Sequence, residues 1–242
     1  MTFNGQTDQA SHLAKTAIVE KTAPRLRGML SHLKQSNASM SPLIHIVDDD
    51  SRLREALKGL LRSMDYETME HASIETFLKA HKPDRPGCVL VDVRLPDGNG
   101  LDLQARMASH GVHQPVIIMT GYGDIAMSVR AMKAGAIDFL TKPVRDQDLF
   151  DAVVAAIGRD QERLSDQEDA TDLEQRYARL SPRERQVMAL VTKGQLNKQV
   201  AGELSLSEAT VKIHRKSAMQ KMKARTLAEW VRLADRLAPR PH

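Results

Sequence analysis

Four groups of polar residues each follow a short apolar run, where a strand of a sheet would end. The groups are Asp48-Asp49-Asp50, Asp92, Thr120 and Lys142-Pro143. Carboxylates that converge repel one another, and a hard divalent cation with oxygen ligands relieves that repulsion. Mg²⁺ suits such a site, because it is held by one or two carboxylates together with water and phosphate oxygens. A lysine and a hydroxyl at the same place would bind a phosphoryl group, which a carboxylate can accept as an acyl phosphate.

The segments that must position these groups alternate between short apolar runs and amphipathic stretches. We expect strands at 43–47, 67–71, 89–92, 116–120 and 137–141, and helices at 52–64, 74–80, 101–109, 125–134 and 148–157. Strands that alternate with helices form a parallel sheet with helices on both faces. Ligands of such sheets bind beyond the carboxyl ends of the strands, near the point where the strand order reverses. The four polar groups should therefore converge at one edge.

Four sequence pieces carry a family resemblance. They are VDDD (47–50), LVDVRLPDGNG (90–100), MTGYGD (119–124) and FLTKP (139–143). Together they resemble the receiver domain of two-component response regulators, and the resemblance covers the whole front domain. It implies an α/β fold, a doubly wound five-stranded parallel sheet in the flavodoxin-like order.

The resemblance also assigns roles to the acidic residues. Asp92 would be the phosphoacceptor and would contact Mg²⁺. Asp49 would bind Mg²⁺ directly, and Asp48 would support it through water. The backbone carbonyl of Arg94 would be a further protein ligand of the metal.

Three more residues receive roles in the same way. Thr120 and Lys142 would each bind an oxygen of the phosphoryl group. Phe139 would be the aromatic residue that switches with Thr120 between buried and exposed positions. The peptide bond between Lys142 and Pro143 is a candidate for the cis form.

Each piece taken singly has a simpler structural interpretation. Asp48-Asp49-Asp50 can be a solvated turn or a helix cap, and Asp97-Gly98-Asn99-Gly100 is first of all a turn. His45 and Met119 lie inside strands and are interpreted as packing residues. Because the pieces arrive in order at the right strand ends, we favour the phosphoacceptor interpretation.

The C-terminal part has a different pattern, in which helix signals follow one another. Ser181-Pro182-Arg183-Glu184 combines a capping serine, a proline at the first position and a glutamate three residues on. Gly194 stops this first helix. Further helices are expected at 198–204, 208–222 and 226–237, the last with Trp230. Two short helices joined by a tight turn, the second rich in basic residues, describe a helix-turn-helix.

The helix at 208–222 should lie in a DNA groove, because an exposed Ile213 between lysines is unusual on a merely solvated face. The stretches LSPRERQVMALV (180–191), NKQVAGELSLSEATVKIHR (197–215) and MQKMKA (219–224) resemble the LuxR-type helix-turn-helix of the NarL and FixJ regulators. By that resemblance Lys212, Ile213 and Lys216 read bases or their flanking phosphates, and Arg215 contacts phosphate or packs. Gln195-Leu196 departs from the family, which more often has a small polar residue before the asparagine.

Charge and composition divide the chain. Residues 180–242 hold 13 basic and 5 acidic side chains, against 13 and 17 in residues 41–158, so nucleic acid is the expected partner of the C-terminal part. We expect a flexible N-terminal extension (1–40), a receiver domain (41–158), an acidic linker (159–179) that can extend the preceding helix, and a smaller all-α helix-turn-helix domain (180–242). Translation from Met40 is an alternative to a natural extension.

Composition also excludes several classes of protein. The single cysteine, Cys88, lies in an apolar run and can form neither a disulfide framework nor a zinc cluster. No apolar stretch approaches the roughly 20 residues of a membrane helix, and no signal peptide opens the chain. We expect a cytoplasmic protein without a membrane partner.

The sequence is thus interpreted as a response regulator rather than an enzyme. A sensor histidine kinase would phosphorylate Asp92, and double-stranded DNA, RNA polymerase and a second copy of the chain would be partners. One alternative is a regulator that acts through protein partners with the basic module idle. Another is an aspartyl-phosphate phosphatase, but its general acid would stand two residues past the nucleophile, where this chain has Arg94.

Overall fold

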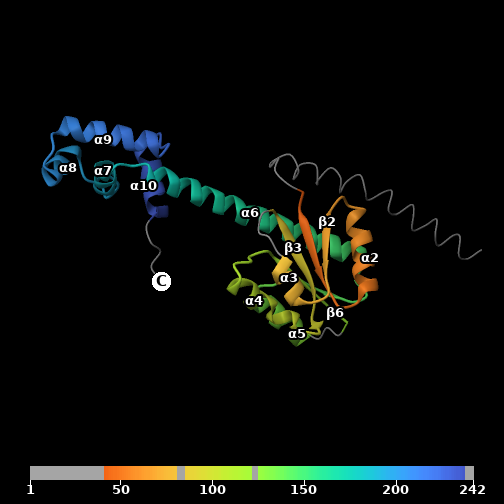
Figure 1. Cartoon of the computed structure of the whole chain (residues 1–242). Helices are drawn as coiled ribbons and strands as arrows, with labels where there is room; N and C mark the ends of the chain where they lie inside the picture. Colours follow the sequence, from red (N-terminus) through yellow and green to blue (C-terminus); the bar gives the residue numbers. More distant parts are fainter. Residues whose placement is uncertain (1–40, 81–84, 122–124, 238–242) are drawn as a thin grey trace, which may run out of the picture. The chain divides into compact units, whose positions relative to one another are not determined.

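The computed structural model describes residues 41–80, 85–121 and 125–237, which form two compact units that divide at Ile157 and Gly158 (Figure 1). The expected N-terminal extension, residues 1–40, lies outside the described residues. Each unit has its own buried core, and the two are taken in turn.

The first unit is built on a five-stranded parallel sheet, which confirms the expected fold class. Its strands follow the order β2-β1-β3-β6-β7. They are β1 (Leu43–Val47), β2 (Glu67–His71), β3 (Gly87–Asp92), β6 (Val116–Thr120) and β7 (Asp138–Thr141). The order reverses between β1 and β3, so a ligand site is expected beyond the carboxyl ends of these two strands.

Alternate residues of the strands point to opposite faces of the sheet, and each face has its own helices. One cluster joins Ile44, Ile46 and Leu90 to α2 (Ser51–Arg62) and to the first part of α6 (Asp146–Ala178). The buried thiol of Cys88 belongs to this cluster. The other cluster joins strand residues such as Val89 and Val91 to α3 (Ile74–Ala80), α4 (Leu103–Ser109) and α5 (Ile125–Lys133).

The segment after β3 is more structured than the expected turn. It forms a small antiparallel pair, β4 (Arg94–Leu95) with β5 (Gly98–Asn99), and then a 3₁₀ turn at Gly100–Asp102. Gly100 is required there, because a Cβ would lie 2.1 Å from the Asp92 carbonyl oxygen. The Asp97 carboxylate accepts the backbone N–H groups of Ile74 and Glu75, at 3.1 and 2.8 Å. The loop after Asp92 therefore caps the start of α3.

Helix α6 is longer than the helix expected at 148–157, since it continues to Ala178. The acidic segment, expected as a linker that can extend the preceding helix, is thus helical. Its residues after Gly158 are mostly good helix formers, and it contains neither proline nor a second glycine. Side chains one turn apart also pair along it, such as Arg163 with Asp160 and Arg176 with Asp172. Hydrophilic composition suggested a linker but does not by itself end a helix.

The second unit is helical and confirms the smaller all-α domain. Its helices are α7 (Pro182–Thr192), α8 (Asn197–Leu204), α9 (Glu208–Lys221) and α10 (Leu227–Leu237). The expected capping box of Ser181 and Glu184 is present, and the Ser207 hydroxyl caps α9 through the Thr210 N–H. Trp230 is buried in a core formed mainly by aliphatic residues of these helices. Among the described residues, no helix is long and apolar enough to span a membrane.

Candidate functional site

The expected acidic site forms at the carboxyl ends of β1 and β3, beside the reversal of strand order. Asp48 is fully buried, Asp92 is 9 % exposed, and Asp49 is exposed. One carboxylate oxygen from each of the three lies within 4.8 Å of the others. Three converging oxygen ligands of this kind suit a hard divalent cation such as Mg²⁺.

Lys142 reaches the same place from the end of β7. Its Nζ lies 2.7 Å from Asp48 Oδ2 and 3.1 Å from Asp92 Oδ2. The peptide bond between Lys142 and Pro143 is cis, as expected. A single ammonium group thus contacts two carboxylates that are otherwise removed from water.

The pKa of Asp92 shows that this balance is incomplete. Burial raises the pKa of the Asp92 carboxyl, and the repulsion by Asp48 adds to the rise, although Lys142 opposes it. Burial by itself would lower the pKa of Lys142, but its contacts with Asp48 and Asp92 outweigh burial and raise it. Two buried carboxylates and one ammonium leave excess negative charge, and a further cation would compensate it. The residues present therefore fit a divalent metal.

Thr120 and Phe139 lie on neighbouring strands next to this site. Thr120 ends β6, is buried, and its hydroxyl lies 4.0 Å from the Met127 sulfur. Phe139 pairs with Ile118 on the adjacent strand, two residues before Thr120. It is partly buried against the cluster that contains Ile118. Thr120 and Phe139 thus share the sheet face covered by α3, α4 and α5.

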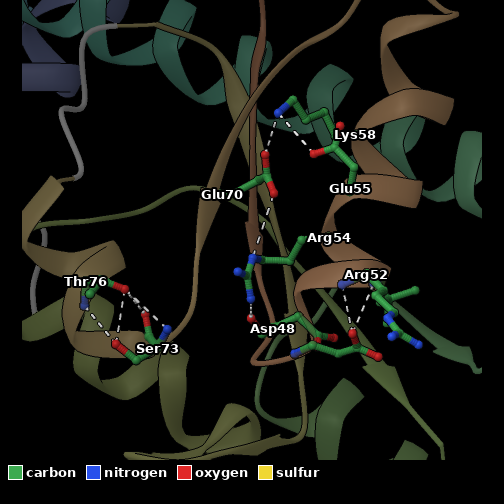
Figure 2. A network of polar contacts seen from close by, with 10 residues as sticks. Asp48, Arg52, Arg54, Glu55, Lys58, Glu70, Ser73 and Thr76 are labelled. Atoms are coloured by element: carbon green, nitrogen blue, oxygen red, sulfur yellow. Dashed lines mark hydrogen bonds and ion pairs between the residues drawn. The ribbon is translucent and has the colours of Figure 1, made fainter.

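The sequence did not predict the role of Arg54, which contacts the backbone of the acidic site. The Arg54 guanidinium of α2 donates to the Asp48 carbonyl oxygen at 2.6 Å, and Glu70 of β2 lies beside Arg54 (Figure 2). Its position one turn into α2 gave no signal, because an arginine there can equally face solvent. Arg94 has an exposed side chain, and its carbonyl as a metal ligand stays a prediction.

Helix α9 carries four basic residues, Lys212, Arg215, Lys216 and Lys221. Lys212 and Lys216 are exposed, and Ile213 is 67 % exposed. Arg215 is half-buried and donates to the Asn197 side chain of α8 at 3.4 Å. A shallow cavity of about 400 Å³ lies between the two helices. Its lining residues are Asn197, Lys212, Arg215, Lys216, Met219, Gln220 and Ala224. Cations that surround an apolar tip on one helix suit a groove of nucleic acid.

A buried carboxylate, that of Glu184, binds two side chains of α9. Glu184 of α7 is 4 % exposed and accepts hydrogen bonds from the Ser181 N–H, the Ser217 hydroxyl and Lys221 Nζ. Burial by itself would raise the pKa of Glu184, but these donors outweigh burial and lower it to about 2. Ser217 and Lys221 both belong to α9, so the capping residue of one helix also holds the basic helix.

Comparison with known families matches both units. Residues 44–154 match the response regulator receiver domain, and residues 178–234 match the bacterial regulatory proteins of the luxR family. The chain is 46 % identical over 211 residues to nodulation protein W of Bradyrhizobium diazoefficiens, covering 87 % of this chain and 92 % of that protein. It is 42 % identical to the response regulator protein TodT of Pseudomonas putida, covering 81 % of this chain and 86 % of that protein.

Solved structures give the same result for the fold. The response regulator StyR matches with a TM-score of 0.72 and 42 % identity, over 81 % of this chain and 99 % of that one. Full-length FixJ from B. japonicum matches with a TM-score of 0.50 and 39 % identity, over 82 % of this chain and 98 % of that one.

Proposed function

Because the chain belongs to the response regulators that join a receiver domain to a LuxR-type DNA-binding domain, we propose that Asp92 is its phosphoacceptor and that α9 reads its DNA site. The protein is a transcriptional regulator of a two-component system rather than an enzyme. This combination of domains implies a histidine kinase and DNA as partners. The single observation that carries the proposal is Asp92 at the strand edge, with Lys142 and two further aspartates around it.

The proposed reaction moves a phosphoryl group from a histidine of the kinase to Asp92. A carboxylate oxygen of Asp92 forms the new bond to phosphorus while the bond between phosphorus and the histidine nitrogen breaks, and that nitrogen keeps the electron pair. Lys142 would move from carboxylate contacts to a phosphoryl oxygen, and Thr120 would donate to another. Asp48, Asp49 and Asp92 would hold Mg²⁺, which when bound neutralises the charge of the phosphoryl oxygens.

The proposed response follows from the neighbours of Thr120. Movement of its hydroxyl toward the phosphoryl group would vacate the space beside Met127 and let Phe139 repack on the same face. We infer that this change favours a phosphorylation-dependent homodimer and that the DNA-bound protein contacts RNA polymerase. Sedimentation with and without beryllofluoride would test the dimer, which unchanged masses over a wide concentration range would contradict.

Phosphoryl incorporation tests the site. Acetyl phosphate with Mg²⁺ should label the wild-type protein, and Asp92→Asn should abolish the label, since the amide cannot form an acyl phosphate. Asp102→Asn, which changes an exposed aspartate in the nearby 3₁₀ turn, should be labelled normally. Intact-protein mass spectrometry measures both. Undiminished labelling of Asp92→Asn would refute the assignment.

Titration against operator and random duplexes tests the DNA interface. Ala substitution of Ile213 and of at least one of Lys212 and Lys216 should cost roughly 1–3 kcal/mol on the preferred site and little elsewhere. Lys193→Ala, an exposed lysine at the end of α7, serves as the control. Equal losses on both duplexes would mean that α9 supplies only charge. Wild-type protein that is not retained on any DNA would instead favour a regulator that acts through protein partners.

A further inference from the structure

Both backbone polar groups of Asp48, the residue that begins the acidic turn, are hydrogen-bonded, one to β2 and one to α2. Its N–H donates to the His71 carbonyl at 3.1 Å. Its carbonyl oxygen accepts from Arg54 Nη1 at 2.6 Å (Figure 2). The first bond belongs to the pairing of β1 with β2, but the second comes from a side chain of α2. The residue that follows β1 therefore has its carbonyl bound to a cation of α2.

The side chain of Asp48 is held as completely as its backbone. Oδ1 accepts the Asp50 N–H at 2.9 Å, and Oδ2 accepts Lys142 Nζ at 2.7 Å. Asp49 lies between Asp48 and Asp50, which are joined by the first of these hydrogen bonds. The peptide group that joins Asp48 to Asp49 is the one whose oxygen Arg54 binds. Its orientation therefore sets the directions in which both carboxylates leave the turn.

Arg54 is in turn ion-paired with Glu70, the residue next to His71 on β2, at a distance too long for a hydrogen bond. Arg54 Nε lies 3.8 Å from Glu70 Oε2, and Lys58, one turn further along α2, lies 2.8 Å from Glu70 Oε1. Arg54 and Lys58 thus share one carboxylate, as Figure 2 shows. The two cations differ in one respect: the contacts of Lys58 are with Glu70 and Glu55, while Arg54 also reaches the Asp48 carbonyl.

We propose that Arg54 is a positioning residue for the divalent cation: its bond to the Asp48 carbonyl fixes the turn that presents Asp48 and Asp49, and Glu70 keeps Arg54 in place. The inference rests on the proposed function, because it assumes that the acidic turn binds a metal. Partners that orient metal ligands affect metal affinity even though they do not touch the metal. Preorganisation is the physical reason, since an unrestrained turn must lose its freedom when the ion binds.

The test measures metal binding directly, without phosphoryl transfer. Mn²⁺ binding to the full-length protein is followed by the electron paramagnetic resonance signal of the free ion, with Mg²⁺ as competitor. Arg54→Ala should weaken Mn²⁺ binding roughly tenfold. Arg54→Lys should weaken it by about threefold, because a lysine keeps the charge without the planar guanidinium. The matched control Lys58→Ala removes a cation from the same Glu70 and should stay within about twofold of wild type.

Two results would overturn the proposal. Unchanged Mn²⁺ affinity in Arg54→Ala would mean that the turn is fixed without Arg54. An equal loss in Lys58→Ala would mean that the ion pairs with Glu70 matter only for the stability of α2 on β2. Thermal unfolding identifies variants that do not fold, and if Arg54→Ala is one of them, Arg54→Lys decides by the same criteria.

Failure of this inference differs from failure of the proposed function. If wild-type protein binds no Mn²⁺ and accepts no phosphoryl group, the acidic site itself is misassigned and both fail. If wild type binds Mn²⁺ and is labelled at Asp92, while Arg54→Ala binds Mn²⁺ equally well, only the positioning role fails.

Discussion

Each unit of the molecule buries carboxylate beside a lysine, and the two arrangements differ in how the negative charge is balanced. In the first unit Lys142 serves both Asp48 and Asp92, and the pKa of Asp92 remains raised by burial. In the second unit Glu184 alone receives Lys221, a hydroxyl and a backbone N–H, and its pKa is lowered to about 2. The carboxylates of the first unit thus lack positive charge beside their lysine, whereas the carboxylate of the second unit has all its hydrogen-bond donors.

The difference distinguishes a candidate site for chemistry from a structural contact. A buried carboxylate with all its partners stabilises one conformation and attracts nothing further. A carboxylate cluster that lacks positive charge is instead a candidate site for chemistry, and we expect it to bind a cation. We therefore expect the two lysines to respond differently to substitution, to metal and to pH.

Loss of Lys142 should have the largest effect. Lys142→Met leaves Asp48 and Asp92 buried without a cation, so the free energy of unfolding of the first unit should fall by about 3 kcal/mol in chelator. Mg²⁺ should restore part of it, because an ion that binds only the folded state stabilises that state. Urea unfolding followed by circular dichroism, with chelator or Mg²⁺, measures both. The control Lys79→Met removes an exposed lysine that pairs with Glu75 and should change little. No recovery in Mg²⁺ would contradict the charge deficit.

Loss of Glu184 should have a smaller effect that metal does not relieve. Glu184→Ala removes the acceptor for Ser181, Ser217 and Lys221, and should lower the stability of the second unit by about 2 kcal/mol. Lys221 is partly exposed and can turn to water, which limits the loss. Fluorescence of Trp230, the single tryptophan, reports unfolding of this unit. Glu203→Ala, at an exposed position of α8, is the control. Rescue of Glu184→Ala by Mg²⁺ would erase the contrast between the units.

The pH dependence of the second unit should have a definite sign. The pKa of Glu184 is about 2 in the folded state against 4.5 ordinarily. The unfolded chain therefore binds the extra proton first as the pH falls. The contribution of Glu184 to stability is complete above about pH 4.5 and is lost toward pH 2, by up to about 1.4 kcal/mol per pH unit. The difference between wild type and Glu184→Gln, measured by Trp230 fluorescence, should shrink over this range. A constant difference would show that Glu184 has an ordinary pKa in the fold.

Local signals account for most of what could be predicted from the sequence. The cap at Ser181 lies within four residues of its partners, and the end of β1 at the aspartates is a change from apolar to acidic residues. The strand ends placed Asp48, Asp92 and Lys142 at one edge because parallel strands share their direction. These features require no knowledge of distant side chains.

Contacts between distant residues account for most of what could not be predicted. Asp97 was interpreted as a turn residue, but its carboxylate caps α3, more than 20 residues earlier. Glu184 was recognised as half of a capping box, while its bonds to Ser217 and Lys221 depend on how α7 packs against α9. The Arg54 contact likewise depends on the position of α2 over β1. No pattern along the chain encodes such packing directly.

Because Cys88 is buried, the reactivity of its thiol can report local opening of the first unit. A thiol with no accessible surface in the middle of the sheet should react with an alkylating reagent only when the first unit opens. The rate of its modification therefore measures how often the first unit opens, in the full-length protein and without an attached probe. Surface cysteines introduced for spectroscopic probes would react much faster, so the native thiol need not be removed first. The single buried thiol thus reports opening of the first unit and interferes little with labelling of introduced surface cysteines.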